Sequence, residues 1–476
     1  MSMSGGGFAS GIIDLGGLEV CQVSTFTKVW ATQEGGPDNH GATFFEPSSL
    51  PDGFFMLGCY GQSNNKPLYG WVLAGKDATN DPSGGALKPP TDYTLVWSSD
   101  SLKIKQEGVG YIWLPIPPDG YKAVGHVITN SPEKPDLDKI RCVRLDFTDS
   151  NENDAWIWGP AKEVSTNGIS IYSSRPRNRG VQAVGVPTGT FVAENNGASL
   201  DLPCLKNANG NQNSMPNQDQ IKALVQAYSP HIYFHPDEQY FPSSVAWFFE
   251  NGALLHTQGD ESNPIPIDPM GSNLPQGGPN DDAYWIDLPI DSAAKERVKK
   301  GDLADAYAYL HVKPMFGKIG EHVGDWEHVT LRISNFNGEL KSMYFSQHSK
   351  GVWADASDLE FENGNKPVAY SSLHGHASYP NQGLVLQGNG SIGIRNDSAK
   401  GKSFMDTGAK FLVVDAEYLG LVKVGKVLPG KLKSAFEKVV NSLPKEVLGE
   451  EGPTGPKMKD SWTGDERSNS IKVGIF

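Results

Sequence analysis

The stretch EHVGDWEHVTLRI, residues 321–333, predicts a β-strand that begins with acidic residues. From Asp325 onward the side chains alternate between the two faces that a strand presents. Two carboxylates stand at the beginning of one face, and the rest of that face is aliphatic: Asp325, Glu327, Val329, Leu331 and Ile333. The strand therefore carries two like charges at the mouth of an apolar stripe.

Like charges two residues apart on one face repel each other and are costly to bury. A divalent cation would compensate them, and His322, across the turn at Gly324, could add a nitrogen ligand. The alternatives are solvent at the start of the strand, or an Arg or Lys partner elsewhere. The pattern makes His322, Asp325 and Glu327 candidate metal ligands.

Two further histidines follow the expected strand at residues 368–373. If the chain stays extended, His374 and His376 point to the same side, and each could be a metal ligand. The alternative is that both are hydrogen-bonded structural residues.

Composition narrows the class of protein. The 476 residues carry a net charge of −14, with 38% hydrophobic and 20% charged residues. This mix can build a core, and the length favours two or three domains. A nucleic-acid partner is not expected, because such proteins usually present a basic face. An anionic membrane is not an obvious electrostatic partner either, unless a cation bridges the contact.

Cysteine is sparse, and the first twenty residues have neither a basic start nor a continuous apolar run. We therefore expect no signal peptide, no transmembrane helix and four free thiols in a soluble, intracellular protein. The thiols are Cys21, Cys59, Cys142 and Cys204.

The chain is expected to be mainly β and to divide near residue 200. Residues 1–197 form an N-terminal β-rich domain with an internal repeat, because Pro51-Asp-Gly53 recurs as Pro118-Asp-Gly120. The alternative is that these motifs only make turns. Residues 198–217 are a linker, 218–448 a β-sandwich decorated with short helices, and 449–476 an extended C-terminal tail. Helices are expected at 218–228, after an Asn217 cap, at 243–250 and at 291–300.

Long strings throughout the chain resemble the plant branch of the vacuolar protein sorting-associated protein 62 family. They are KVW (28–30), GFFMLGCYGQSNNKPLYGWVLA (53–74), PTDYTLVWSSDS (90–101), GEHVGDWEHVTLRISNFNGEL (320–340), YFSQHSKGVWADASDLEFENGNKPVAYSSLHGHASYP (344–380), GIRNDSAKG (393–401) and GEEGPTGPKMKDSWTGDER (449–467). The resemblance implies a link to vacuolar trafficking. This chain is shorter before Gly320 than the plant relatives, so a strand is missing or replaced there.

A shorter motif, His322-x-x-Asp325-Trp-Glu327, is similar to the GHRHDWE signature of the necrosis-inducing cytolysins. That resemblance implies a β-sandwich in which the matching His, Asp and Glu hold a divalent cation, here Mg²⁺, Ca²⁺ or Mn²⁺. His374 or His376 could match a downstream histidine near that site. The upstream Asp of those proteins has no counterpart, because Lys313, Pro314 and Met315 occupy its place.

Two classes of function follow. The first is a non-enzymatic trafficking or membrane-associated module, cytoplasmic or peripheral to endomembranes, whose partner is a lipid headgroup or a trafficking protein. The second is a metal-dependent enzyme with one open coordination position, although no general base has an obvious spacing. A membrane-damaging, cytolysin-like protein is a weaker third alternative, because no secretion signal is expected. The candidate metal ligands are His322, Asp325, Glu327, His374 and His376, and the enzyme alternative uses all of these except His374.

Overall fold

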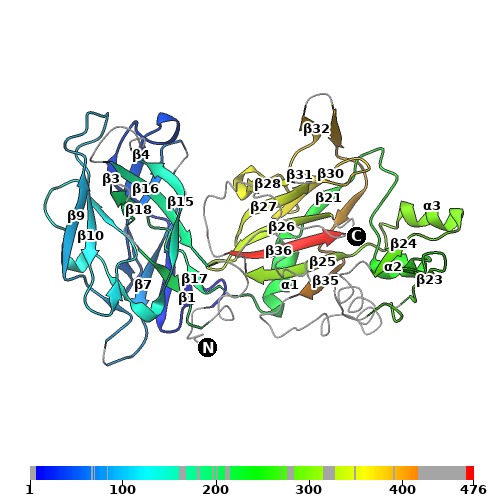
Figure 1. The fold of residues 1–476 in the computed structure, drawn as a ribbon, viewed down its shortest axis with the longest axis horizontal. Coiled ribbons are helices and arrows are strands. Elements are labelled where there is room, and N and C mark those ends of the chain that lie inside the picture. Colours follow the sequence, from blue (N-terminus) through cyan, green and yellow to red (C-terminus); the bar gives the residue numbers. More distant parts are fainter. Residues whose placement is uncertain are drawn as a thin grey trace.

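The computed structural model is mainly β, as the sequence predicts, and its strands gather in two regions that lie side by side (Figure 1). We call them the N-terminal region, β1 to β20, and the C-terminal region, α1 to β36. The structure describes residues 7–65, 68, 70–82, 84–159, 168–178, 183–195, 198–199, 202–209, 215–269, 271–275, 283–314, 327–347, 350–389, 392–415 and 468–475.

The N-terminal region consists of small antiparallel sheets around shared apolar cores. In sheet order their strands are β1 (Ile12–Asp14), β2 (Leu18–Val23), β7 (Val72–Asp77) and β5 (Phe55–Met56); β3 (Phe26–Ala31), β4 (Ala42–Pro47) and β6 (Tyr60–Ser63); β12 (Val127–Thr129), β10 (Tyr111–Ile116) and β9 (Asp92–Ser98); β11 (Tyr121–Lys122), β13 (Cys142–Arg144) and β8 (Leu87–Lys88); β14 (Thr148–Asp149), β20 (Cys204–Lys206) and β17 (Gly185–Val186); β15 (Asn151–Trp158), β16 (Ile169–Pro176), β18 (Val192–Asn195) and β19 (Ala198–Ser199).

The two Pro-Asp-Gly motifs of this region form the same turn. Gly53 and Gly120 both have φ near 79°, a left-handed conformation that favours glycine. Each turn is closed by an N–H of the following aromatic residue, which donates to the proline carbonyl at 3.0 Å in one copy and 3.1 Å in the other. The repeated letters therefore correspond to repeated backbone geometry.

Equivalent segments meet a few residues beyond these turns. Gly58 and Gly125 lie against each other and against Thr190, so a Cβ on Gly125 would lie 2.8 Å from the Leu57 carbonyl oxygen and 2.9 Å from the Cα of Gly58. The Thr190 hydroxyl donates to the Val124 carbonyl at 3.0 Å. Only a glycine lets two backbones approach this closely, so the meeting point depends on both glycines.

All four cysteines lie in the N-terminal region, and the structure confirms that they are free and buried. Burial raises the pKa of Cys21 to about 11 and the pKa of Cys59 and Cys142 to about 12. Because the thiolate is the reactive form, we expect these side chains to be inert at neutral pH.

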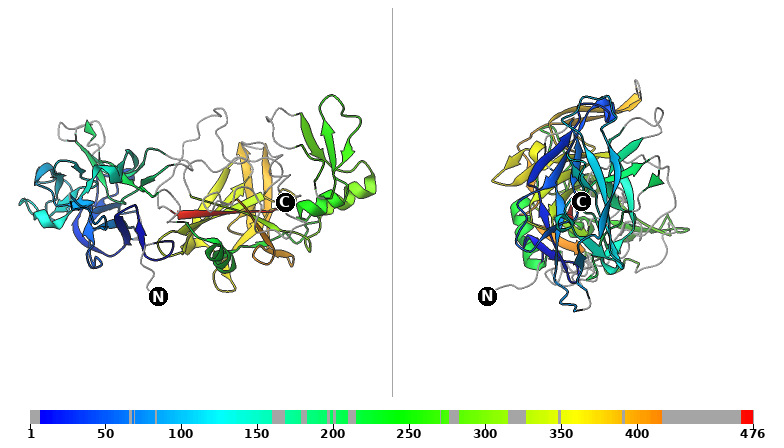
Figure 2. Two further views of the ribbon diagram at one scale, coloured as in Figure 1. Left: turned by 90° about the horizontal axis from the view of Figure 1, so that it is seen from below. Right: turned by 90° about the vertical axis from the view of Figure 1, so that its left-hand side faces the viewer.

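The C-terminal region has two main sheets, a smaller sheet, a hairpin and three helices among its described residues (Figure 2). The six-stranded sheet runs β28 (Lys350–Asp355), β27 (Leu340–Gln347), β26 (Glu327–Ser334), β36 (Ser468–Ile475), β25 (Ala308–Pro314) and β35 (Phe411–Asp415). The second sheet contains β29 (Phe361–Glu362), β30 (Lys366–Ser371), β21 (His231–Tyr233), β34 (Phe404–Asp406) and β31 (Ser378–Tyr379). The remainder are β23 (Ile265–Pro266), β22 (Leu254–Thr257) and β24 (Tyr284–Asp287); β32 (Gly383–Asn389) and β33 (Ile392–Ser398); and α1 (Gln218–Tyr228), α2 (Val245–Glu250) and α3 (Ser292–Lys300).

The two main sheets and α1 share one apolar core. Val329 and Leu331 of β26 pack in the same cluster as Ile232 of β21 and Leu224 of α1. The helix begins where the sequence predicts, because Asn217 and Gln220 form a reciprocal capping box. The other two predicted helices also form, capped by Ser244 and Asp291. In the described part of the chain, no helix is both long and apolar enough to span a bilayer.

Two segments depart from the expected domain plan. Residues 198–199 and 204–206, which we expected in the linker, are strands β19 and β20 of the N-terminal region. Leu202, Cys204 and Leu205 are buried there, a short apolar run that the surrounding Asn and Gly residues obscure. Residues 468–475, expected in the extended tail, form β36 between β25 and β26. The strand β36 thus has a partner on each side.

Candidate functional site

The predicted acidic strand exists as β26, which begins at Glu327. The Glu327 carboxylate accepts a hydrogen bond from the Ser346 hydroxyl at 3.2 Å. Burial and the charge of Glu327 together raise the pKa of Tyr379 to about 12. His322 and Asp325 lie outside the described residues. The structure therefore places one member of the predicted acidic pair.

His374 and His376 contact a different carboxylate, that of Glu238. The His374 N–H donates to Glu238 at 2.8 Å, and its Nδ1 lies 3.7 Å from the same side chain. Nε2 of His376 lies 3.2 Å from the carboxylate and 3.1 Å from the Tyr240 carbonyl oxygen. We call these three side chains the Glu238 cluster.

The backbone explains why the strand-based expectation for the two histidines does not hold. The strand β30 ends at Ser371, and His374 and His376 have φ of 61° and 52°. Residues other than glycine adopt this left-handed conformation rarely. The turn is held by the His376 N–H, which donates to the Ser372 carbonyl at 3.0 Å, and by the bond from His374 to Glu238. The two histidines are thus directed by a turn and not by strand alternation.

Glu238 stays ionised although its side chain is only 1% exposed. Burial alone would raise the pKa of Glu238. The N–H donors of Tyr240 and His374, the nearby His376 and the N–H of Gln239 outweigh burial and hold the pKa below its usual value. Sequence reasoning missed this residue, because no spacing links it to histidines that follow it by more than a hundred positions.

The described residues do not assemble a metal site. Among them, no group of three or more His, Cys, Asp or Glu side chains is arranged to hold an ion. Glu327 is engaged by Ser346, while His374 and His376 face Glu238. The predicted divalent cation depends on His322 and Asp325, so it stays a prediction.

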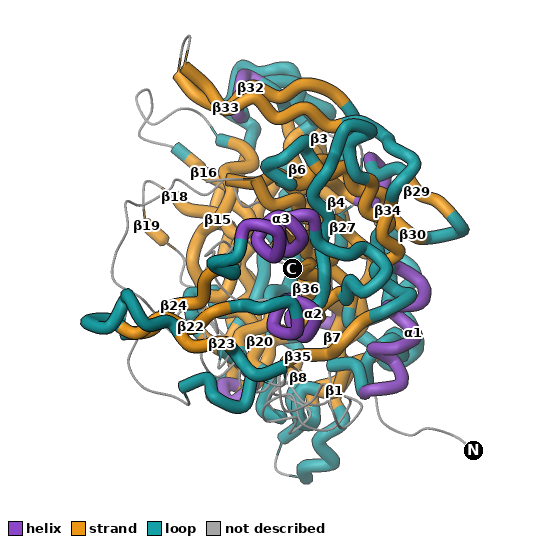
Figure 3. The backbone as a smooth tube through the Cα atoms, turned by 90° about the vertical axis from the view of Figure 1, so that its right-hand side faces the viewer, coloured by secondary structure: helices purple, strands orange, loops and turns teal. Residues whose placement is uncertain are grey.

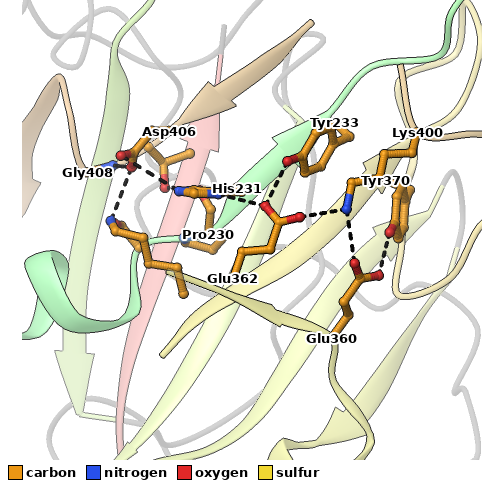
Figure 4. Close-up of polar contacts among 12 residues, drawn as sticks. Pro230, His231, Tyr233, Glu360, Glu362, Tyr370, Lys400, Asp406 and Gly408 are labelled. Carbon is orange, nitrogen blue, oxygen red and sulfur yellow. Dashed lines mark hydrogen bonds and ion pairs between the residues drawn. The ribbon is translucent and has the colours of Figure 1, made fainter. Parts of the chain in front are cut away.

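A larger polar network, shown in Figure 4, links β21, β29 and the segment after β33. The Lys400 ammonium lies 2.6 Å from Glu362 and 3.1 Å from Glu360, and 4.5 Å from the centre of the Tyr233 ring. The Tyr233 hydroxyl donates to Glu362 at 2.7 Å. The bond from Lys400, opposed by partial burial and aided by Tyr233 and His231, lowers the pKa of Glu362 to about 2.

The network continues to β34 through a buried histidine. Nδ1 of His231 lies 3.2 Å from Glu362, and its Nε2 lies 3.7 Å from Asp406. Lys366 lies 3.2 Å from Asp406 and donates to the Ser229 hydroxyl. Each carboxylate thus faces a cation or a donor, an arrangement that fixes neighbouring strands to one another.

The hairpin β32–β33 projects from the C-terminal region (Figure 1), and β33 ends two residues before Lys400. Its two strands form a sheet of their own, and the Ser398 hydroxyl at its base donates to the carbonyls of Asn381 and Gly383. Leu384, Val385 and Leu386 are 48%, 38% and 70% exposed. Successive side chains of a strand point to opposite faces, so both faces of the hairpin expose apolar groups.

The chain matches the family model of vacuolar protein sorting-associated protein 62 over residues 1–318, 316–424 and 420–466. No curated protein matches the chain. The crystal structure of GNIP1Aa from Chromobacterium piscinae is similar at 18% identity with a TM-score of 0.34; the match covers 45% of this chain and 41% of that one, which is less than half of either. Because the family model spans nearly all of the sequence, the chain belongs to the vacuolar protein sorting-associated protein 62 family.

Proposed function

We propose that this chain is a non-enzymatic, membrane-associated module of vacuolar sorting that touches the cytoplasmic face of endomembranes with the hairpin β32–β33. The observation that carries the proposal is the run of exposed apolar side chains at residues 384–386, on a hairpin that projects from the sheets. The family description supplies the trafficking context.

Transfer of the exposed apolar side chains of this hairpin from water into lipid is favourable in free energy. Removing apolar surface from water is favourable by about 25 cal/mol per Å², which amounts to about 2 kcal/mol for a leucine side chain that becomes fully buried. Three half-exposed side chains would therefore gain about 3 kcal/mol in the interfacial layer of a bilayer. That is enough for reversible contact, which suits a peripheral protein.

The base of the hairpin supports this role. Lys400 is held by Glu360 and Glu362 only two residues beyond the end of β33. Apolar side chains next to a fixed base lose less conformational freedom on contact than those of a mobile loop, so more of the favourable transfer free energy remains. The network of Figure 4 is, on this proposal, the support of the contact and not a catalytic centre.

Vesicle flotation of the full chain tests the proposal. Unmodified protein should float with phosphatidylcholine vesicles, and the double variant Leu384→Ser, Leu386→Ser should float much less. The control is Leu137→Ser, a leucine of the N-terminal region that is also exposed. If unmodified protein stays with the soluble fraction, or the double variant floats as well as it does, the hairpin is not a membrane contact.

The predicted divalent cation has its own test. Thermal unfolding of the protein should shift to lower temperature with a chelator and recover with Mg²⁺, Ca²⁺ or Mn²⁺, because an ion that binds only the folded state stabilises it. Asp325→Ala should abolish the response, while His328→Ala should keep it. Identical unfolding curves with chelator and with added ion would leave the two carboxylates without a cation.

A further inference from the structure

A second exposed surface lies at the end of the C-terminal region farthest from the N-terminal region (Figures 1 and 2). It combines the edge strand β24, the loop that follows it and α3. We call it the α3 platform, and its members are Tyr284, Trp285, Ile286, Ile290 and the basic residues of α3.

The apolar part of the platform is exposed although the sheet beneath it is anchored. Tyr284, Trp285 and Ile286 are 52%, 39% and 39% exposed, and Ile290 is 78% exposed. Leu255, which pairs with Ile286 across the strands, is buried in a core cluster with Phe249. The exposed side chains therefore belong to a fixed surface and not to a frayed end.

One ring of the platform is held in place. Trp285 stacks on His256 with ring centroids 5.2 Å apart and an interplanar angle of 10°. Tyrosine and tryptophan favour the headgroup layer of a bilayer, because each ring has an apolar body and a polar tip. Tyr284 and Ile286 lie on one face of β24 and Trp285 on the other, so both faces of this edge strand offer apolar surface to an interface between water and lipid.

The charged part of the platform is the outer surface of α3. The helix has one buried side chain, Val298, and exposes Lys295, Arg297, Lys299 and Lys300. Lys299 pairs with Glu296 at 2.9 Å. Lys295, Arg297 and Lys300 form no ion pair with any carboxylate that the structure describes, so three cationic groups face solvent beside the apolar patch.

Three aspartates flank the platform, and their carboxylates accept hydrogen bonds from backbone N–H groups. Asp287 accepts from Leu288 at 2.6 Å, Asp291 accepts from Ala294 at 2.8 Å and caps α3, and Asp302 accepts from Ala304 at 2.9 Å. The acidic groups are thus engaged at turns, while the basic groups extend outward. The platform is therefore locally basic, although the net charge of the whole chain is −14.

We propose that the α3 platform binds anionic phospholipid, with the β24 side chains in the headgroup layer and α3 against the phosphates. The inference rests on the proposed membrane association and adds the class of lipid. In Figure 3 the hairpin β32–β33 lies at the top of the view and α3 near its centre, facing the viewer, so the platform is a contact surface separate from the hairpin. Each basic group near an anionic surface strengthens binding about 5-fold, or about 100-fold for three.

The test compares phosphatidylcholine vesicles with and without phosphatidylserine. Unmodified full-length protein should bind the anionic vesicles more tightly, and the triple variant Lys295→Gln, Arg297→Gln, Lys300→Gln should lose about 100-fold on those vesicles alone. The matched control is Lys103→Gln, Lys122→Gln, Lys222→Gln, which removes the same charge from exposed positions elsewhere.

A salt titration of vesicle binding tests the charged contact with unmodified protein alone. Added salt should release it from anionic vesicles and leave its binding to neutral vesicles unchanged, because screening weakens only the charged contact. Equal binding to both kinds of vesicle, or a triple variant that behaves like the control, would overturn the lipid assignment and leave the proposed function standing. Absence of binding to every vesicle would overturn both.

Discussion

Buried imidazoles occur in both regions of the molecule, in opposite surroundings. His126 of the N-terminal region is fully buried, stacks on Phe191 with ring centroids 5.7 Å apart, and has its pKa lowered by burial to about 4. In the C-terminal region the buried His231 faces Glu362 and the partly exposed His376 faces Glu238, each at 3.2 Å. One region therefore buries a neutral ring among apolar groups, and the other places its rings against carboxylates. Mild acid should weaken the first before the second.

The largest expected effect is a loss of stability that is confined to the N-terminal region. Gly125→Ala adds a Cβ 2.8 Å from the Leu57 carbonyl oxygen, so the meeting point of the repeated segments must open. We expect the free energy of unfolding of this region to fall by about 3 kcal/mol, measured by denaturant unfolding and by hydrogen exchange. The control is Gly75→Ala, whose Cβ has leucine methyl carbons as its three nearest neighbours, at 3.4 Å. Equal losses for the two variants would show that the close approach is not essential.

The second-largest expected effect is a loss of stability in mild acid that is due to the buried His126. The unfolded chain binds a proton at His126 near pH 6.5, and the folded chain binds it only near pH 4. Stability is therefore lost as the pH falls through this window, by about 2 kcal/mol at pH 5. His126→Phe keeps the stacking and should remove the loss, measured as urea unfolding at pH 5 and pH 8. The exposed His40→Phe serves as the control, and a loss that persists in the His126 variant would assign the acid response to other groups.

The third prediction concerns the Glu238 cluster. Glu238→Gln removes the negative charge that accepts the backbone N–H groups of Tyr240 and His374 and lies 3.2 Å from Nε2 of His376. A buried charged acceptor contributes more than a neutral one, so the C-terminal region should lose about 1.5 kcal/mol in unfolding free energy. Glu133→Gln, at an exposed position, should change nothing measurable. A neutral result at Glu238 would mean that the turn, and not the carboxylate, holds the two histidines.

The smallest expected effect is at the base of the hairpin. Lys400→Met removes the ammonium between Glu360 and Glu362 while keeping most of the side-chain length. Because this ion pair is partly exposed and screened, the expected loss is about 1 kcal/mol. The pKa of Glu362 should rise from about 2 toward its ordinary value, which NMR titration measures. The neighbouring Lys402→Met is the control, and an unchanged Glu362 titration would contradict the assigned cause.

Local signals predicted the parts of this fold that depend on neighbours in sequence. The Asn217 cap, the two Pro-Asp-Gly turns and the strand observed over Glu327–Ser334, which was expected from Asp325 onward, all depend on patterns within a few residues. The features that sequence reasoning missed depend on distant partners. Glu238 meets His374 through a turn of unusual backbone, and β36 is recognisable only beside β25 and β26.

The candidate site was predicted least well for the same reason. His374 and His376 were recognised as residues with a role, but their partner could not be deduced, because left-handed φ values redirect side chains that alternation would have aligned. The exposed hairpin gave no signal either. The run Leu384 to Leu386 reads like any buried strand until the tertiary structure shows that these three side chains are 38% to 70% exposed.

The position of β36 has a consequence for how the chain is made. The strands β25 and β26 leave the ribosome long before residues 468–475, yet among the described strands of this sheet β36 is the one that lies between them and pairs with both. During synthesis each has an unsatisfied edge, and such edges pair readily with the wrong chain. Pairing over so long a sequence separation is slow, because the intervening loop must close first. The nascent C-terminal region is thus a natural client for a chaperone, and a premature stop before residue 468 would leave that vulnerable state permanent.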